Sequence, residues 1–222
     1  MRYCLIFILS AIQIYSTEVS VSLTYGIEKL GLDKYYQFNT KDSVRITKLK
    51  IFISNVSLLK NDKEVWRKSR SYHLVDMDNV ATLTIIKELP PIDYDKISIG
   101  LGIDSTTNVS GALGGDLDPT KGMYWTWQSG YINIKIEGNC NLIKNRNNEF
   151  QLHLGGYQFP NYTYLETQFP AKQDKDIIIE LDIKELLEKI QIAEISHIMS
   201  PSKTAKNISL MISKMLKVQL ND

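Results

Sequence analysis

Alternation of apolar and polar residues is the feature that most constrains the fold of this chain. From Val19 to about Glu180 apolar residues recur at every second position, which is the period of a β-strand with one buried face. Turn-forming segments such as Gly114-Gly115-Asp116 separate these runs. The expected strands are 19–25, 44–53, 81–85, 97–101, 132–136, 150–154 and 177–181. Many half-buried strands without intervening helices predict an all-β fold, an antiparallel β-sandwich, with a barrel as the alternative.

Residues 182–222 change to a helical period. Asp182 can cap a helix, with Glu185 three residues later, and Ser200-Pro201 offers a second cap followed by a first-turn proline. Two apolar stripes follow these caps: Ile183, Leu186, Leu187 and Ile190, then Ala205, Ile208, Ile212, Met215 and Leu216. We expect two short C-terminal helices that pack against one end or edge of the sheets. No linker or repeat divides the chain, so residues 17–222 are predicted to form one domain.

The N-terminus has the pattern of a targeting segment. Arg2 precedes an apolar run over residues 4–15, and polar sequence begins at Ser16. The run is too short to span a bilayer comfortably and predicts a cleaved signal peptide over residues 1–16. The mature protein is then expected in the periplasm or otherwise exported, without a transmembrane span. A buried first strand or helix is the alternative. After cleavage Cys140 is the only cysteine left, which excludes an intramolecular disulfide.

Charge and motifs exclude several functions. A net charge of +1 gives no electrostatic reason to expect nucleic acid as a partner. The chain has no Gly-x-Ser-x-Gly, phosphate-loop, His-Glu-x-x-His or paired-cysteine metal motif. No nucleophile and base stand out together. We therefore expect a non-enzymatic protein.

The segment 118–131 is rich in aromatic residues. It begins with an Asp-Pro-Thr-Lys-Gly turn and contains Trp125, Trp127 and Tyr131. Residues at i and i+2 of a strand point to the same face, so the two indole rings are predicted to stand side by side, with Tyr131 further along that face. Such a face either fills a core or forms a prebuilt binding site.

Three histidines are the candidate metal ligands. His153 alternates with core-facing Leu152 and Leu154, so it is predicted to point to the opposite face of its strand, which by parity also holds Trp125 and Trp127. His197 and Met199 together supply imidazole and thioether donors, which suit copper. His73 is expected on the exposed face of a strand. The alternative for each is an ordinary surface, loop or hydrogen-bonded role.

Several segments, in order, resemble the MbnP-like family, the methanobactin-associated periplasmic copper-binding proteins. They are Ile53-Ser54-Asn55-Val56, Tyr72-His73-Leu74-Val75-Asp76, Leu101-Gly102-Ile103-Asp104-Ser105-Thr106-Thr107-Asn108, the run from Gly122 to Tyr131, and Leu152-His153-Leu154-Gly155-Gly156. The chain is most similar to the branch found in Bacteroidetes. The resemblance covers most of the mature chain. It implies an exported β-sandwich.

The resemblance also implies copper as the bound metal. In the family, histidines and a tryptophan oxidised to kynurenine hold the ion, and a di-haem enzyme of the cytochrome-c-peroxidase type performs the oxidation. Carried over to this sequence, Trp125 or Trp127 is the modified residue and His153 a ligand. The copper-binding branch has an Asn-His pair where this chain has Asn108-Val109, so His73 or His197 would have to replace the missing imidazole. The alternative is the same fold without a metal site, as an envelope binding or interaction protein.

Overall fold

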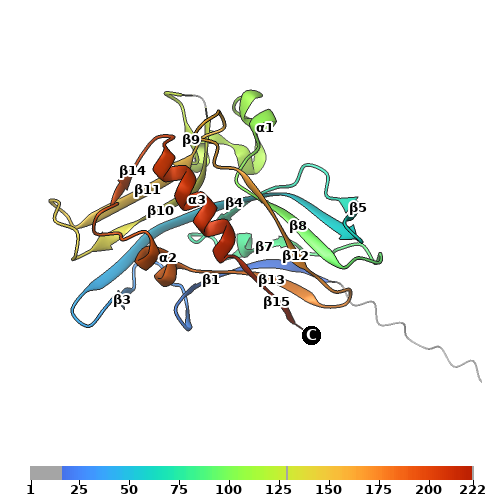
Figure 1. Cartoon of the computed structure of the whole chain (residues 1–222), viewed down its shortest axis with the longest axis horizontal. Coiled ribbons are helices and arrows are strands. Elements are labelled where there is room, and N and C mark those ends of the chain that lie inside the picture. Colours follow the sequence, from blue (N-terminus) through green and yellow to red (C-terminus); the bar gives the residue numbers. More distant parts are fainter. Residues whose placement is uncertain (1–16, 129, 222) are drawn as a thin grey trace, which may run out of the picture.

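Two β-sheets packed around a shared core form the body of the protein (Figure 1). The computed structural model describes residues 17–128 and 130–221, so the expected leader over 1–16 lies outside the described residues. The large sheet has the order β12 (Leu165–Pro170), β8 (Lys96–Leu101), β4 (Ser43–Lys60), β10 (Gly130–Cys140), β11 (Glu149–Gly155) and β14 (His197–Ile198). Four short strands join it: β3 (Tyr35–Gln37), β5 (Lys63–Arg67) and β6 (Tyr72–Asp76) pair with β4, and β9 (Tyr124–Trp125) pairs with β10.

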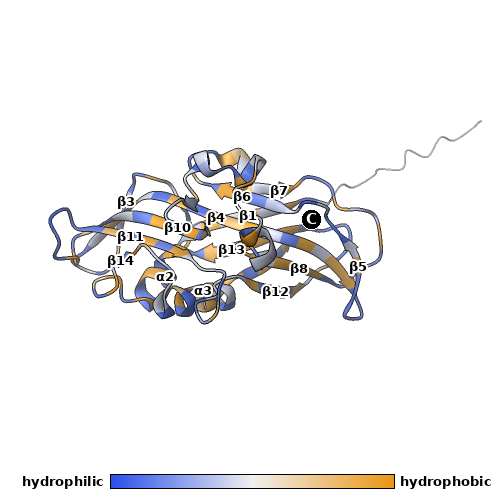
Figure 2. Cartoon of the chain, turned by 90° about the horizontal axis from the view of Figure 1, so that it is seen from above, coloured by the Kyte–Doolittle hydropathy of each residue, from blue (hydrophilic) through white to orange (hydrophobic). Residues whose placement is uncertain are grey.

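The smaller sheet has the order β15 (Lys217–Asn221), β13 (Asp176–Asp182), β1 (Val19–Tyr25) and β2 (Glu28–Lys29), and β7 (Thr84–Ile86) also pairs with β1. Its apolar residues alternate as expected: in β1 and β13 every second side chain is buried. The same alternation of hydrophobic and hydrophilic residues is visible along strands of both sheets (Figure 2). Burial of these side chains between the sheets is the main stabilising contribution to the fold.

The sheets are mixed, which corrects the prediction of a wholly antiparallel sandwich. β1 pairs with β13 in parallel, and so does β11 with β14; the other strand pairs are antiparallel among the described residues. Parallel pairing needs a long crossover, and both pairs are connected by long stretches of chain. Period-two alternation reports one buried face but says nothing of strand direction.

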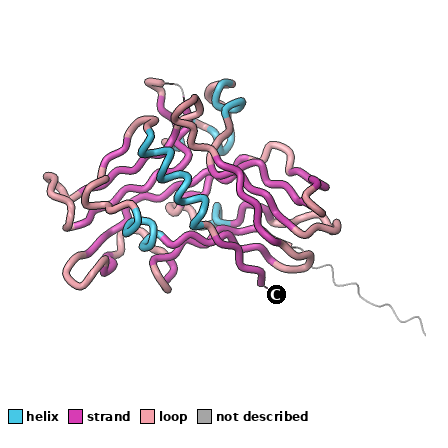
Figure 3. The backbone as a smooth tube through the Cα atoms, viewed as in Figure 1, coloured by secondary structure: helices cyan, strands magenta, loops and turns pink. Residues whose placement is uncertain are grey.

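The two C-terminal helices form close to where they were expected (Figure 3). Asp182 accepts hydrogen bonds from the first turn of α2 (Ile183–Lys189). The second helix, α3 (Lys203–Met215), is capped by Ser202, two residues later than predicted. It lies along β11 and β12, and its buried apolar side chains belong to the main core. No helix in the described residues is long and apolar enough to cross a membrane.

Short helical elements replace two expected features. Residues 81–85 were expected to be strand, but a 3-10 turn, η1 (Val80–Leu83), precedes β7 because the Asn79 side chain accepts a hydrogen bond from the Ala81 amide. A third helix, α1 (Ser105–Val109), was not predicted, since five residues are too few to show a helical stripe. Two further 3-10 turns follow it, η2 (Gly115–Leu117) and η3 (Pro119–Lys121).

Residues 103–128, here called the cap, carry α1, η2, η3 and β9 and cover part of the outer face of the large sheet. A second hydrophobic cluster lies beneath the cap, separate from the main core. Phe52 shows which face this is: it belongs to the second cluster, while its neighbours Ile51 and Ile53 belong to the core. The cluster consists of Phe52, Leu74, Ile103, Leu117, Met123, Trp125, Tyr131 and Ile132.

Candidate functional site

The cap is attached to the sheet by buried amide side chains. Asn108, at the end of α1, accepts a hydrogen bond from the Tyr131 amide and donates to the Ile103 carbonyl. Asn133 accepts from the Ile103 amide on the other side. Buried backbone groups need such partners, because an unsatisfied group costs about 1–3 kcal/mol. Asn108 and Asn133 therefore fix the position of the cap on β10, a role that the sequence pattern did not reveal.

The two tryptophans differ sharply in their surroundings. β9 ends at Trp125, and a turn carries Trp127. Trp125 is 5% exposed and packs in the second hydrophobic cluster with Tyr131, whereas Trp127 is 63% exposed. Strand alternation thus does not reach Trp127, and the prediction of one shared strand face is wrong for it. The rings nevertheless lie close together, with centroids 5.9 Å apart and planes at 46°.

Trp125 lies over Gly155 at the end of β11. A methyl group added to Gly155 would come within 2.6 Å of Cζ3 of Trp125, so the indole occupies the space that a side chain would fill. His153 stands two residues earlier on the same strand and therefore on the same face. The indole Nε1 of Trp125 is buried and has no hydrogen-bond partner among the described residues. Trp125, over Gly155, therefore lies on the same side of the sheet as His153, which is two residues away along β11.

The two ring nitrogens of His153 differ in their hydrogen bonding. It is 6% exposed, and its Nε2 lies 2.6 Å from Oε1 of Glu137 on β10. Its Nδ1 is buried and makes no hydrogen bond to any described residue. Burial lowers the pKa of His153, outweighing the hydrogen bond to Glu137, and the charges of Lys135 and His197 lower it further. A neutral ring follows, and with Nε2–H donated to Glu137 the lone pair is assigned to Nδ1.

Glu137 is a residue that reasoning from the sequence missed. In the β10–β11 register it pairs with Gln151, diagonally across from His153. The register of the β10–β11 hairpin, continuous from Asn139↔Glu149 to Ile134↔Leu154, sets this alignment, and alternation alone does not report register. The only signal available was a carboxylate with the same parity as His153 on the partner strand.

β14 brings a second imidazole to the same face. His197 pairs with Gln151 of β11, so its side chain shares the face of Gln151 and His153. It is exposed, and it is near enough for its charge to act on His153. Met199 directly follows β14 and lines the same cavity as His197, with a volume of about 520 Å³. Two predicted ligands, distant from His153 in sequence, therefore lie at the same sheet edge.

His73 lies elsewhere. In β6 it pairs with Ile53, a core residue, so it stands on the opposite face of the large sheet from His153. Its Nε2 is 3.2 Å from Oγ of Ser71. Burial lowers its pKa, and the nearby charge of Lys68 lowers it further. The expectation of an exposed strand face is therefore wrong, and His73 cannot act together with His153.

The position of the missing family histidine is open to solvent. Val109 ends α1 and is 74% exposed. Within residues 17–128 and 130–221, no group of three or more histidine, cysteine, aspartate or glutamate side chains is arranged to hold a metal ion. A metal site at His153, on the outer face of the large sheet, would need other donors, such as the thioether of Met199 or a modified aromatic ring.

Comparisons with known proteins agree on the class of protein. The fold is similar to the solved structure of MbnP from Methylosinus trichosporium, with a TM-score of 0.58 over 83% of this chain and 80% of that chain, at 12% sequence identity. No curated protein sequence matches the chain. The family model for MbnP matches residues 15–200. The chain therefore belongs to the MbnP family, as the sequence motifs indicated.

Proposed function

We propose that the protein is an exported, non-enzymatic copper-binding protein that holds the metal through Nδ1 of His153, on the face that also carries His197 and Met199. The observation that supports this most directly is the unpartnered buried Nδ1. A ring that donates one N–H to a carboxylate and keeps the other nitrogen free is the arrangement typical of metal-binding histidines. Membership of the MbnP family points to copper as the metal and to the periplasm as the compartment.

The donor set suits the reduced ion. Imidazole and thioether groups are soft or borderline ligands that favour copper(I). The lowered pKa of His153 keeps its ring neutral near pH 7, so that binding needs no proton to be displaced from the free nitrogen. Glu137 acts as a positioning residue, because it fixes the orientation and tautomer of the ring. When bound, copper would supply a redox-active centre near the surface.

The tryptophans are the proposed source of a further ligand. Oxidation of an indole to kynurenine would create an amine and a carbonyl beside the histidine face. Trp127 is open to a modifying protein, while Trp125 is enclosed by the cap and lies over Gly155. A di-haem enzyme of the cytochrome-c-peroxidase type is the proposed modifying partner.

A second function is supported by a separate observation. Val109 replaces the family histidine, and no cluster of three of the commoner ligand types exists in the described residues. The same fold without a metal site would then act as an envelope binding or interaction protein. The two proposals differ in what happens when copper(I) is added.

Competition of the purified mature protein with a chromogenic copper(I) chelator distinguishes them. His153→Ala is expected to weaken copper(I) binding by well over tenfold. Glu137→Gln is expected to weaken it by about tenfold or more, the loss typical when the hydrogen-bond partner of a metal-binding histidine is removed. His73→Ala is a matched control, since it removes a half-buried imidazole from the opposite face. Equal copper(I) affinity of the wild type and His153→Ala would exclude a copper site at His153 and favour the second proposal, an interaction protein without a metal site.

Native protein from its own host gives a further test. Peptide mass spectrometry of the segment with Trp125 and Trp127 is expected to show the mass change of conversion to kynurenine. Protein made without the modifying enzyme serves as the unmodified reference. Two unmodified tryptophans in native protein would remove kynurenine from the proposal but leave the test with His153→Ala intact.

A further inference from the structure

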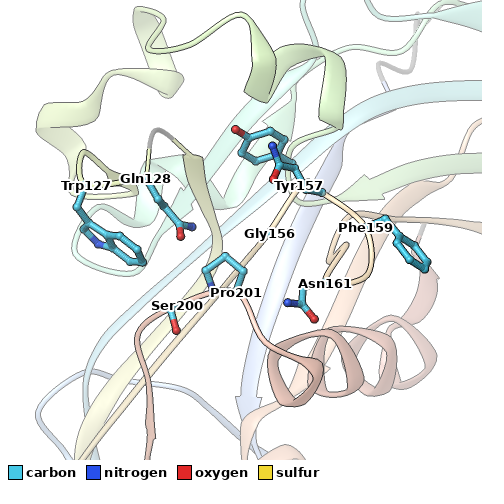
Figure 4. A pocket seen from close by; sticks show the side chains of 9 residues that line it. Trp127, Gln128, Gly156, Tyr157, Phe159, Asn161, Ser200 and Pro201 are labelled. Atoms are coloured by element: carbon cyan, nitrogen blue, oxygen red, sulfur yellow. The ribbon is translucent and has the colours of Figure 1, made fainter.

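A cavity of about 370 Å³ lies between the cap and the loop that follows β11. Trp127 and Gln128 line it from the cap, and Tyr157, Phe159 and Asn161 line it from the loop, with Ser200 and Pro201 between them (Figure 4). The volume is at the lower end of the range of about 300–1,000 Å³ typical of small-molecule sites.

The polar groups that line this cavity are neutral, and several of them have no partner in the part of the chain that the structure describes. None of its lining residues carries a charge. The amides of Gln128, Gln158 and Asn161 and the hydroxyl of Ser200 form no hydrogen bond with another described part of the chain. Each amide can both donate and accept, and so can the hydroxyl. These groups would pair with a ligand that itself offers several donors and acceptors in a small space.

Three aromatic side chains line the cavity, and two of them, Trp127 and Phe159, are exposed. The ring of Trp127 packs against the buried ring of Trp125, and Phe159 is almost wholly exposed. Tyr157 is wedged against Gly130, where an added methyl would lie 3.1 Å from its ring. Aromatic faces held open to solvent at a polar cavity favour a ligand that is apolar on one side and polar around its edge.

We propose that this cavity binds a neutral sugar, as a monosaccharide or the end of a short oligosaccharide. The C–H face of a sugar ring packs on Trp127, while its hydroxyls pair with the unused amides. An anion would lack a basic partner in the lining, and an ammonium ion could contact the aromatic rings but would leave its charge without a carboxylate and most of the amides without a partner. A wholly apolar ligand would leave the amides unpaired at a cost of about 1–3 kcal/mol each. The sugar is the class that satisfies both sets of groups.

The test is NMR titration of the full mature chain, without copper, with neutral sugars built from glucose, galactose, mannose and N-acetylglucosamine. At least one is expected to bind saturably, with a dissociation constant of about 1 mM or lower. Trp127→Ala and Asn161→Ala should each weaken binding by roughly two- to tenfold. Tyr35→Ala, an exposed aromatic on β3 outside the cavity, is the matched control and should bind like wild type.

Asn161 also separates this proposal from the copper site, because it is not among the proposed ligands. Asn161→Ala is expected to leave copper(I) affinity unchanged. The proposal is overturned if no neutral sugar in the panel binds up to about 10 mM, a limit ten times the expected constant. It is equally overturned if binding survives both substitutions, or if only charged analogues, such as choline or a sugar acid, shift the cavity signals.

Discussion

The two faces of β11 differ in what their side chains contact. On the inner face Phe150, Leu152 and Leu154 are fully buried in the core between the sheets. On the outer face His153 has a nitrogen without a hydrogen-bond partner in residues 17–128 and 130–221, and Gly155 leaves room for an indole. Side chains on the inner face belong to the main hydrophobic cluster, while the outer face carries a buried polar atom with no partner among the described residues. The inner face of β11 therefore contributes mainly to stability, and the outer face carries the candidate metal ligand.

The largest expected effect is on the inner face. Leu152→Ala should lower the free energy of unfolding by about 2–5 kcal/mol, because it leaves a cavity in a core that cannot fully relax. Gln151→Ala, one residue away on the outer face, should change it by less than about 1 kcal/mol. Urea denaturation followed by circular dichroism measures both. Similar losses for the two variants would contradict the assignment of the faces.

A smaller effect is expected where the cap meets the outer face. Gly155→Ala forces a methyl group against Cζ3 of Trp125 and the Tyr131 carbonyl, each 2.6 Å from its position. Overpacking of this kind costs about 1–3 kcal/mol. Gly114→Ala, where nothing lies within 4 Å, is the control and should be nearly neutral. Urea denaturation and tryptophan fluorescence of both variants provide the measurement; a neutral Gly155→Ala would mean that Trp125 does not lie over β11.

The smallest effect is on the pH dependence of stability. Burial lowers the pKa of both His153 and His73, so the unfolded chain, with a histidine pKa near 6.5, binds protons more readily than the folded protein. The contribution of these two neutral histidines to the free energy of unfolding is therefore fully present above about pH 6.5, and it is lost as the pH falls below that value. Melting temperatures between pH 8 and pH 5 should show this loss, and His153→Gln should reduce it. A melting temperature that rises on acidification would contradict the buried neutral rings.

Alternation predicted the inner faces well, because a period of two directly reports which side chains are buried. It predicted the strands around Leu152 and Ile177 and, with the Asp182 cap, the start of α2. It could not give pairing partners that are distant in sequence. The parallel pair of β1 and β13 and the placement of His197 beside β11 both depend on tertiary contacts.

The candidate site was less predictable for a physical reason. Parity placed Trp125 and His153 on one face, but it fails where a strand ends, as it does before Trp127. The contact between His153 and Glu137 depends on the register of β10 and β11, and the placement of His73 on the core face depends on its pairing with β4. Strand register and pairing are set by the packed sheet rather than by the residues that form the site.

The copper site depends on His153, whose Nε2 is held by Glu137 and whose Nδ1 is proposed to bind copper(I). Long-range ¹H–¹⁵N NMR of the histidine rings tests it directly, since copper(I) is diamagnetic. Before addition, His153 should show the Nε2–H tautomer; after addition, its Nδ1 signal should shift while both His73 nitrogens stay in place. A His153 ring protonated at Nδ1, or one whose signals do not move with copper(I), would contradict the account.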